Sequence, residues 1–272
     1  MNTREQIIKI HAEILENKSL GADFYQLRLK FPEQVKALPA QFVMLSFAER
    51  RDLYLPRPFS IFDCEGNTLQ ILYKIVGKGS AYLASLREKD KLQCTMPLGN
   101  SFEKPDGADE VFLVGGGFGV APLHFFKKYY ASQLQRETHF LVGAKTREQL
   151  SFLPILKDTD EIHVATDDGS SGFKGFVTEL FAKKFAEILE TRKLKSVLIL
   201  ACGPSNMLKA LKEMLSSLRL QTKVTMRAYF SMEARMACGF GVCNGCVVKT
   251  KNGYKRVCYE GPVFDADNLL FD

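Results

Sequence analysis

Residues 114–123 read VGGGFGVAPL, and this glycine-rich stretch decides how the middle of the chain folds. It follows the apolar run EVFLVGG at 110–116, which predicts a buried parallel strand, and it opens a predicted helix at 121–134. Glycines at such a turn let the backbone approach a ligand, and the free N–H groups of a helix N-terminus attract phosphate. The full G-x-G-x-x-G fingerprint is absent, so the loop alone also fits a tight strand-to-helix turn.

The strand–helix alternation continues beyond this loop. Further strands are predicted at 138–144, 161–166 and 196–203, and further helices at 176–190 and 208–218. Strands that alternate with helices imply a parallel sheet with both faces covered. The sequence therefore predicts an α/β parallel-sheet nucleotide-binding domain at 106–225.

The first third of the chain has a different texture. Short runs at 23–31, 41–48 and 69–77 read as strands separated by turns. This texture predicts a small antiparallel β-barrel at 1–105. Together, the barrel, the α/β domain and a short cysteine-bearing tail predict an α+β multidomain protein.

The C-terminal segment, 226–272, carries four of the seven cysteines: Cys238, Cys243, Cys246 and Cys258. Their intervals of four, two and eleven residues match the C-x4-C-x2-C…C spacing of plant-type [2Fe–2S] sites. Gly239, Gly241 and Gly245 let the backbone pass close to inorganic sulfides. A structural zinc site and incidental buried thiols are the alternatives, but zinc ribbons usually repeat C-x2-C, and the second half here has a single cysteine.

Two more unusual loops follow predicted strands. ATDDGSSGFKG occupies 165–175 and ACGPSNML occupies 201–208. Because ligands bind outside the carboxyl ends of parallel strands, both loops are candidates for a nucleotide site. Asp167 and Asp168 suit a ribose hydroxyl and would repel a 2′-phosphate, which favours NAD over NADP. The alternative is that these aspartates only cap a turn or a helix.

Two stretches of the predicted barrel carry polar groups that suit a phosphate. LPRPFSIFD at 55–63 contains Arg57, which can neutralise a pyrophosphate. LYKIVGKGSAYL at 72–83 contains Gly79 and Ser80, which could present N–H groups at the start of a helix. From the residues alone these signals are weak, since an arginine in a loop and a glycine-containing turn are common.

Composition limits the class of protein. The chain of 272 residues is 46% hydrophobic and 25% charged, as ordinary globular proteins are. Its net charge of +6 is spread along the chain without a DNA-binding pattern, so no nucleic-acid partner is expected. The charged start lacks an apolar signal region, and no apolar run approaches the roughly 20 residues that span a bilayer. We therefore expect a cytoplasmic protein without membrane contact, in which clustered cysteines bind metal or do redox chemistry.

The motifs occur in an order that one family uses: RPFS at 57–60, KGS at 78–80, GGGFGVAP at 115–122, CGP at 202–204, and then the cysteine run. In this order they resemble the ferredoxin–NADP reductase superfamily. Within it, the tail SMEARMACGFGVCNGCVVKT at 231–250 is similar to the electron-transfer subunits of class 1B dihydroorotate dehydrogenases. The resemblance covers nearly the whole chain.

The resemblance implies an N-terminal FAD-binding barrel, an NAD-binding α/β domain and a C-terminal [2Fe–2S] domain. The residues that match its flavin motifs are Arg57, Pro58, Phe59, Ser60, Tyr73, Lys74, Ile75, Gly79 and Ser80. Those that match its nicotinamide side are Gly115, Gly116, Gly117, Gly119, Asp167, Asp168, Cys202 and Gly203. The cluster ligands that it implies are Cys238, Cys243, Cys246 and Cys258, and no residue is assigned a catalytic role.

The resemblance also implies a place in a larger enzyme. In the family an FMN-containing catalytic subunit oxidises dihydroorotate in pyrimidine biosynthesis, and a heterotetramer with two copies of each subunit is expected. Electrons would pass singly to the cluster, move to FAD and leave on NAD, because a flavin exchanges one or two electrons. Related flavin subunits serve hydrogenases, glutamate-synthase-like enzymes and ferredoxin:NAD(P) reductases, which are alternative partners. A non-enzymatic iron–sulfur or zinc module, such as a redox sensor, is the alternative from another class.

Overall fold

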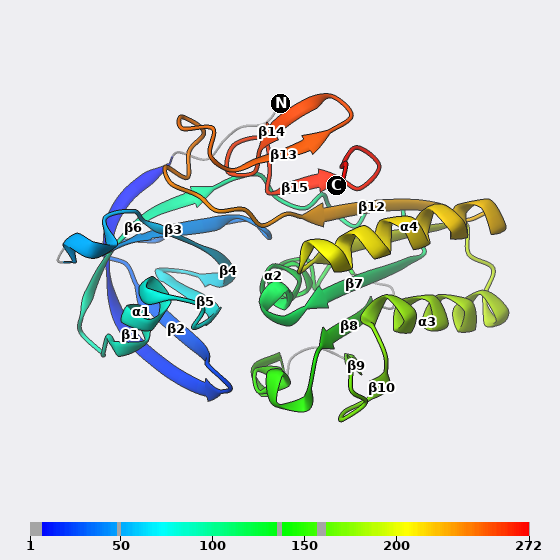
Figure 1. The fold of residues 1–272 in the computed structure, drawn as a ribbon, viewed down its shortest axis with the longest axis horizontal. Helices are drawn as coiled ribbons and strands as arrows, with labels where there is room; N and C mark the ends of the chain where they lie inside the picture. The colour runs from blue at the N-terminus through cyan, green and yellow to red at the C-terminus, as the bar shows by residue number, and fades with distance from the viewer. Residues whose placement is uncertain (1–6, 48–49, 135–137, 157–161, 272) are drawn as a thin grey trace.

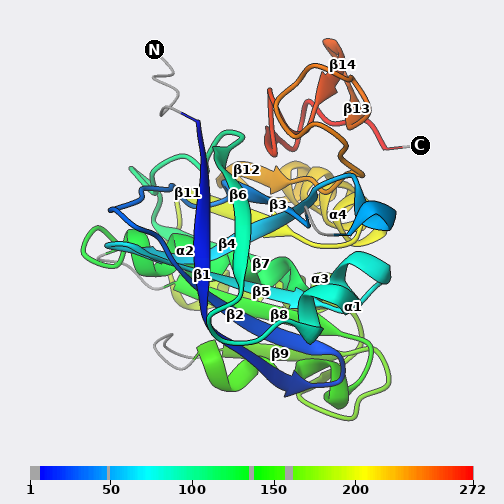
Figure 2. The same ribbon diagram turned by 90° about the vertical axis from the view of Figure 1, so that its left-hand side faces the viewer.

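The structure, a computed structural model, describes residues 7–47, 50–134, 138–156 and 162–271. An antiparallel barrel lies at one end of the molecule and an α/β part at the other, with the C-terminal segment across the top (Figure 1). The view onto the barrel end shows the C-terminal strands outside the barrel, on the same upper side (Figure 2). The predicted α+β multidomain architecture is confirmed.

Six antiparallel strands close the barrel in the order β1-β2-β5-β4-β3-β6. Their bounds are β1 (Ile8–Gly21), β2 (Phe24–Lys30), β3 (Phe42–Ser46), β4 (Arg57–Glu65), β5 (Thr68–Lys74) and β6 (Lys91–Leu98). Leu27 and Leu29 of β2, like Leu69 and Ile71 of β5, are fully buried and alternate with more exposed residues, as strands with one buried face do. A 3-10 helix, η1 (Arg51–Leu53), precedes β4, and α1 (Lys78–Ser85) links β5 to β6.

Two predicted strands of the barrel are confirmed, 23–31 as β2 and 69–77 as β5. The strand at 41–48 is confirmed as β3, although Ala48 lies outside the described residues. The expectation that Arg57 lies in a loop is wrong, because it begins β4, which pairs with β3 on one side and β5 on the other. Prolines on both sides of this arginine hide the strand, although a proline at the start of a strand is tolerated.

The second sheet has seven strands in the order β10-β9-β8-β7-β11-β12-β15. Their bounds are β7 (Glu110–Gly116), β8 (Thr138–Ala144), β9 (Ile162–Thr166), β10 (Phe173–Lys174), β11 (Ser196–Cys202), β12 (Thr225–Ser231) and β15 (Val263–Asp265). All pairs are parallel except that of β12 with β15. Chain order reverses between β7 and β11, and such a switch point opens a crevice at the carboxyl ends of the strands. The predicted strands are confirmed, while Glu161 lies outside the described residues.

Helices cover both faces of this sheet, as predicted. α2 (Val120–Tyr129) packs on the face that holds Val111 and Leu113. α3 (Val177–Thr191) and α4 (Ser205–Gln221) pack on the opposite face, which holds Phe112 and Val114. Burial on both faces explains why β7 reads as a continuous apolar run. Short 3-10 helices follow β7 and β8: η2 (Gly117–Gly119), η3 (Arg147–Leu150) and η4 (Leu153–Leu156).

The barrel is fastened to the α/β part through α2. Lys128 Nζ of α2 lies 2.7 Å from the buried carboxylate of Asp63 in β4. His124 stacks on Phe62 with ring centroids 4.3 Å apart and an interplanar angle of 10°. His124 is therefore a buried packing residue.

The C-terminal segment combines a small hairpin with irregular backbone. β13 (Val247–Thr250) and β14 (Gly253–Arg256) form the hairpin. Residues 236–246, here called the cysteine loop, contain neither helix nor strand. β12 crosses the predicted boundary between 225 and 226, and β15 returns from the tail to pair with β12. Among the described helices, none combines the length and the apolar character that crossing a membrane requires.

Candidate functional site

A cavity of about 580 Å³ lies against the barrel. Its walls come from β4, β5 and the start of α1 on one side, and from residues 231–236 at the end of β12 on the other. Eight of the nine residues predicted for the flavin line it: Arg57, Pro58, Phe59, Ser60, Tyr73, Lys74, Gly79 and Ser80. The ninth, Ile75, stands between two lining residues, and its N–H donates to the Asp23 carbonyl (2.9 Å).

Arg57 lies against the first turn of α1. Gly79 makes this possible, because a Cβ at that position would lie only 2.8 Å from Arg57 Nε. The Ser80 hydroxyl accepts hydrogen bonds from the N–H groups of Val76 (2.9 Å) and Gly77 (3.2 Å). Ser80 therefore caps the first turn, while the guanidinium of Arg57 supplies a fixed positive charge at the cavity wall.

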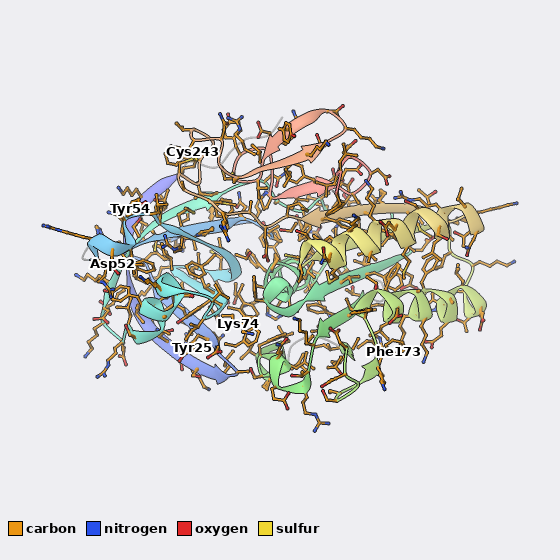
Figure 3. All side chains as sticks on the ribbon, viewed as in Figure 1. Tyr25, Asp52, Tyr54, Lys74, Phe173 and Cys243 are labelled. Carbon is orange, nitrogen blue, oxygen red and sulfur yellow. The ribbon has the colours of Figure 1, made fainter. Side chains whose placement is uncertain are left out.

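Aromatic rings form another part of the wall. The Tyr73 ring stacks on Tyr25 at a centroid distance of 5.4 Å and meets the edge of Phe59 at 5.8 Å. Its hydroxyl donates to Asn17 Oδ1 (2.9 Å), and burial raises the pKa of this phenol above its usual value. The network fixes these rings, which suits the binding of a flat aromatic ligand. Figure 3 shows Tyr25 and Lys74 on the side of the barrel that faces the α/β part.

Glu233 supplies the one carboxylate among the residues that line the cavity. Its side chain faces the open space, yet the surrounding walls desolvate it and raise its pKa to about 7. No motif in the sequence assigns this residue to a site. Its position between the end of β12 and the first clustered cysteine is the sequence feature that could have pointed to a role in the site.

The glycine-rich loop follows β7 at the switch point of the sheet. A Cβ on Gly115, Gly116 or Gly119 would lie within 3.0 Å of neighbouring protein atoms, so packing alone requires these glycines. Gly117 is different, because its φ is +56° and nothing lies within 4 Å of a Cβ placed there. Phe118 beside it lines the cavity. The loop therefore combines a tight turn with open space beside the cavity.

Three strands bring further predicted residues to this edge. Cys202 of β11 pairs in register with Gly115 of β7 and with Ser231 of β12. Cys202 is buried, and desolvation raises the pKa of its thiol. Ser231 lines the cavity, whereas Cys202 stands one strand behind that wall. Gly203 packs on Gly116, since a Cβ on Gly203 would lie 3.0 Å from the backbone nitrogen of Gly116.

The two aspartates after β9 have different surroundings. Asp168 Oδ1 accepts hydrogen bonds from Ser170 N (2.9 Å) and Ser170 Oγ (2.6 Å), and these bonds lower the pKa of Asp168. Asp168 thus caps a turn, as the alternative reading expects. Asp167 is exposed at the same edge of the sheet. The structure therefore leaves Asp167 as the better placed candidate for a ribose.

The four clustered cysteines lie as two pairs. The Cys258 N–H donates to Cys246 Sγ (3.4 Å), and both residues are buried. Cys238 pairs with the exposed Cys243, whose backbone and thiol contribute to the hydrogen bonds that outweigh desolvation and lower the pKa of Cys238 to about 6. Desolvation, with the thiol of Cys246 beside it, raises the pKa of Cys258 to about 12. Figure 3 shows Cys243 at the outer edge of the molecule.

No group of three or more His, Cys, Asp or Glu side chains is assembled as a metal site within the described ranges. The two cysteine pairs are nevertheless electrostatically coupled, because Cys238 is one of the charges that act on Cys258. Gly239 and Gly241 have φ of +82° and +92°, which lets the chain wrap between the pairs. The four cysteines are thus close enough to interact, and they lie as two separate pairs.

Arg256 ties the cysteine loop to the segment that carries Cys258. Its Nη1 donates to the Gly241 carbonyl (2.7 Å), and its Nε and Nη2 donate to the Glu260 carboxylate (3.0 and 2.5 Å). This bidentate pair lowers the pKa of Glu260 to about 2. The guanidinium also lies over the Tyr259 ring, 4.3 Å from its centroid. Arg256 is therefore a structural cross-link within residues 236–263, here called the cysteine segment, which contains the cysteine loop and Cys258.

The cavity wall runs directly into the cysteine loop. Met236 lines the cavity and stands two residues before Cys238. Gly239 packs on the barrel, because a Cβ there would lie 2.7 Å from Met44 Cγ in β3. The barrel, the cavity and the cysteines thus form one continuous site.

Comparison with protein families agrees with this arrangement. Residues 233–270 match the family described as the iron–sulfur cluster binding domain of dihydroorotate dehydrogenase B. Residues 113–213 match the oxidoreductase NAD-binding domain family. The first match contains the cysteine loop and the second contains the glycine-rich loop.

Relatives align along almost the whole chain. It is 35% identical over 268 residues to the dihydroorotate dehydrogenase B (NAD(+)) electron transfer subunit homolog of Aquifex aeolicus, covering 97% of this chain and 99% of that one. It is 34% identical over 267 residues to the dihydroorotate dehydrogenase B (NAD(+)) electron transfer subunit of Caldanaerobacter subterraneus, with the same 97% and 99% coverage.

Solved structures share the fold. An NADH-dependent reduced ferredoxin-NADP oxidoreductase superposes with a TM-score of 0.77 at 25% identity, covering 100% of this chain and 92% of that chain. A ferredoxin NADP+ reductase from Neisseria gonorrhoeae superposes with a TM-score of 0.67 at 18% identity, covering 83% and 99%, which shows the fold alone. The chain therefore belongs to the family of dihydroorotate dehydrogenase B electron transfer subunits, and it is an oxidoreductase subunit with an NAD-binding domain and an iron–sulfur binding domain.

Proposed function

We propose that the chain passes electrons from an FMN-containing dihydroorotate dehydrogenase subunit through a [2Fe–2S] cluster and FAD to NAD+ in pyrimidine biosynthesis. The observation that carries this proposal is the continuity of residues 231–238, because residues 231–236 form one wall of the cavity and the first clustered cysteine follows two residues later. FAD in the cavity would supply the exchange between single electrons and hydride that joins a cluster to a nicotinamide. The family relatives, which are named electron transfer subunits, support it.

The cavity fits a flavin in this proposal. Arg57, held against Gly79, would pair with the pyrophosphate, and Ser60 with Pro58 and Phe59 would line the isoalloxazine. The other residues assigned to FAD binding are Tyr73, Lys74, Ile75, Gly79 and Ser80. Ile75 enters only as the backbone link between two lining residues, since its own side chain is not part of the wall.

The cysteine loop fits a two-iron cluster better than zinc. A [2Fe–2S] cluster takes its four thiolates as two on each iron, and Cys238 with Cys243, and Cys246 with Cys258, lie as two such pairs. A structural zinc takes its four ligands around one point. The low pKa of Cys238 favours the thiolate that either metal needs.

The edge of the parallel sheet would receive NAD. The glycine-rich loop with Gly115, Gly116, Gly117 and Gly119 would face the pyrophosphate, where Gly117 leaves room. Cys202 and Gly203, at the carboxyl end of β11, would lie on the nicotinamide side of this site. Asp167, with Asp168 holding the turn, would accept the ribose hydroxyls and disfavour a 2′-phosphate.

The division of the chain follows from these assignments. Residues 1–105 would bind FAD, 106–225 would bind NAD and 226–272 would bind the cluster. No residue is proposed as catalytic, because this chain would position cofactors while the partner subunit oxidises dihydroorotate. Two copies of each subunit would form the complex.

The test is reconstitution. The chain would be produced anaerobically together with the FMN-bearing dihydroorotate dehydrogenase from the same genome, and the two would be purified on a tag carried by one of them. Co-purification and NADH formation that requires both subunits, dihydroorotate and NAD+ is the expected result. Absence of a stable complex, or dihydroorotate-dependent NADH formation without this chain, would contradict the proposal.

The alternative function is that of a flavin and iron–sulfur reductase subunit in another complex. The structural likeness to an NADH-dependent reduced ferredoxin-NADP oxidoreductase favours it. Purification from the native cells would then recover a hydrogenase-type or glutamate-synthase-like partner in place of the dihydroorotate enzyme.

A further inference from the structure

Asn100 connects the exit of the barrel to the cysteine segment. It follows β6, two residues after the strand ends. Its Nδ2 donates to the carbonyls of Glu260 (3.0 Å) and Val263 (2.9 Å), and its Oδ1 accepts from the Val263 N–H (2.8 Å). Its own N–H donates to the Gly261 carbonyl (2.6 Å). One residue thus makes four hydrogen bonds to a segment more than 150 positions away in the chain.

The residues around Asn100 leave this contact little freedom. Gly99 has φ of +77°, and a Cβ there would lie 2.5 Å from Pro262 Cδ and 2.9 Å from the Gly261 carbonyl. The Gln41 side chain donates to the Gly99 carbonyl (3.2 Å). The backbones of the barrel exit and of the cysteine segment therefore touch directly, and Asn100 locks their register.

The segment that Asn100 holds is shared by the cavity and the cysteines. Cys258 precedes Glu260 by two residues. Pro262 lines the cavity, and its carbonyl accepts from the N–H of Met232 (2.9 Å) in the wall formed by residues 231–236. Movement of residues 260–263 would thus displace Cys258 relative to β4 and β5, the barrel strands that form the facing wall of the cavity.

We infer that Asn100 is a positioning residue for electron transfer, which sets the separation between a flavin in the cavity and a cluster on the cysteines. The inference rests on the proposed function. In the measurable direction, NADH would transfer a hydride to FAD, which with one proton gives FADH2 and releases NAD+. FADH2 would then give one electron to the oxidised cluster and release a proton, while the second electron stays on the flavin. Asn100 acts mainly on the second step, because its four bonds reach residues 260–263 and none of them reaches the glycine-rich loop or the loops after β9 and β11.

The experiment compares full-length wild type with Asn100→Ala and Asn100→Asp. The aspartate has nearly the same size and keeps the acceptor for the Val263 N–H, but it turns a carboxylate oxygen toward two carbonyls. Asn67→Ala is the matched control, because Asn67 Nδ2 donates to the Phe31 carbonyl (3.2 Å) within the barrel alone. Anaerobic stopped-flow mixing with NADH resolves flavin bleaching from cluster reduction, and FAD and iron contents are measured beside it.

We expect flavin bleaching at the wild-type rate in all variants. Cluster reduction should be slower by about three- to tenfold in both Asn100 variants, because misplacing the cluster lengthens the path over which the electron passes from the flavin. The paramagnetic signal of the reduced cluster should keep its shape, because the ligands are unchanged. A purely structural role would instead lower cofactor content or slow both steps together.

A second readout needs no cofactor turnover. The Val263 amide should exchange its hydrogen slowly in the wild-type chain and at least about tenfold faster in Asn100→Ala, because its acceptor is gone. Equal cluster-reduction rates in wild type and Asn100→Ala, or fast exchange at Val263 in the wild type, would overturn the inference. Wild-type protein that binds neither FAD nor iron would instead overturn the proposed function, and the inference with it.

Discussion

The walls of the cavity and the cysteine loop are built from different kinds of backbone. Arg57 to Ser60 lie in β4, where the ladder to β3 holds them, and Tyr73 and Lys74 lie in β5, where the ladder to β2 holds them. Residues 236–246 have no such ladder, and their shape rests on glycines, on Arg256 and on the contact with the barrel. The first region resembles a preformed pocket and the second a loop that its ligand completes.

This contrast predicts which part of the site depends on its cofactor. A pocket walled by strands keeps its form when it is empty, because packing and the ladder stabilise it. A set of thiolates without regular structure gains order from the metal that it binds, since metal affinity is coupled to folding. Loss of the cluster should therefore leave the flavin pocket intact, and loss of FAD should leave the cluster in place.

The largest effect should come from a cluster ligand. Cys243→Ser removes the exposed member of one thiol pair and should abolish most of the [2Fe–2S] absorbance and iron while FAD is retained. Cys64→Ser, which changes a thiol on β4 of the barrel, is the control and should keep the full iron content. Unchanged iron in Cys243→Ser would contradict the assignment of Cys243 as a ligand, and loss of FAD together with iron would contradict the independence of the pocket from the cysteine loop.

The next effect concerns the pocket. Arg57→Ala should cost about 1.5–3 kcal/mol of FAD binding, or about ten- to hundredfold in affinity, because a charge-assisted contact is lost. Arg57→Lys should recover part of this, since lysine keeps the charge without the fork. Arg28→Ala, which breaks an exposed ion pair with Glu16 (3.6 Å), should change FAD affinity little. Titration of FAD into cofactor-free protein measures all three, and equal dissociation constants for wild type and Arg57→Ala would contradict the assignment.

A smaller effect is expected at the nucleotide edge. Asp167→Ala should raise the KM for NADH by about two- to tenfold, as the loss of an exposed hydrogen-bond acceptor costs about 0.5–1.5 kcal/mol. It should also narrow the preference for NADH over NADPH. Asp168→Ala should act mainly through the turn that Ser170 closes, with equal losses for both nucleotides. Diaphorase kinetics with an artificial acceptor separate the two, and an unchanged preference in Asp167→Ala would place the ribose elsewhere.

The smallest effect concerns stability and pH. The pKa of Glu233 is raised to about 7 by desolvation, so its protonated form is favoured in the fold, and the stability that it contributes is lost as pH rises through 7. Glu233→Gln should therefore raise the Tm of cofactor-free protein at pH 8, with the difference shrinking toward pH 5.

Glu260 should have the opposite effect on stability, since Arg256 lowers its pKa to about 2 and the stability that it contributes is present above its unfolded pKa. Glu260→Gln should lower the Tm at pH 8, and equal shifts in the two variants would contradict the contrast between cavity and cysteine segment.

Much of this fold is predictable from the chain itself. The apolar strand before the glycine-rich loop and the alternating strands of the barrel follow from periodicity, and the cysteine intervals mark the tail. β4 is missed because prolines flank Arg57, although tertiary pairing with β3 and β5 makes it a strand. The glycines after β7 look like a ligand signature, yet for three of them the structure gives a packing reason.

The remaining features depend on contacts between distant segments. Glu233 reads as an ordinary acid until the end of β12 brings it to the cavity. Asn100 reads as a turn residue until the fold brings residues 260–263 against it. Asp167 and Asp168 look equivalent in sequence, and only the turn closed by Ser170 separates them. Local pattern cannot supply such long-range information.

The most direct test of the account is an anaerobic titration of the purified chain with NADH, followed by absorbance and low-temperature electron paramagnetic resonance. NADH should bleach bound FAD, and the rhombic signal of a reduced [2Fe–2S] cluster should then appear, with about two iron atoms and about one FAD per chain. A colourless protein that contains zinc, or a flavin that NADH bleaches while no cluster signal develops, would contradict it.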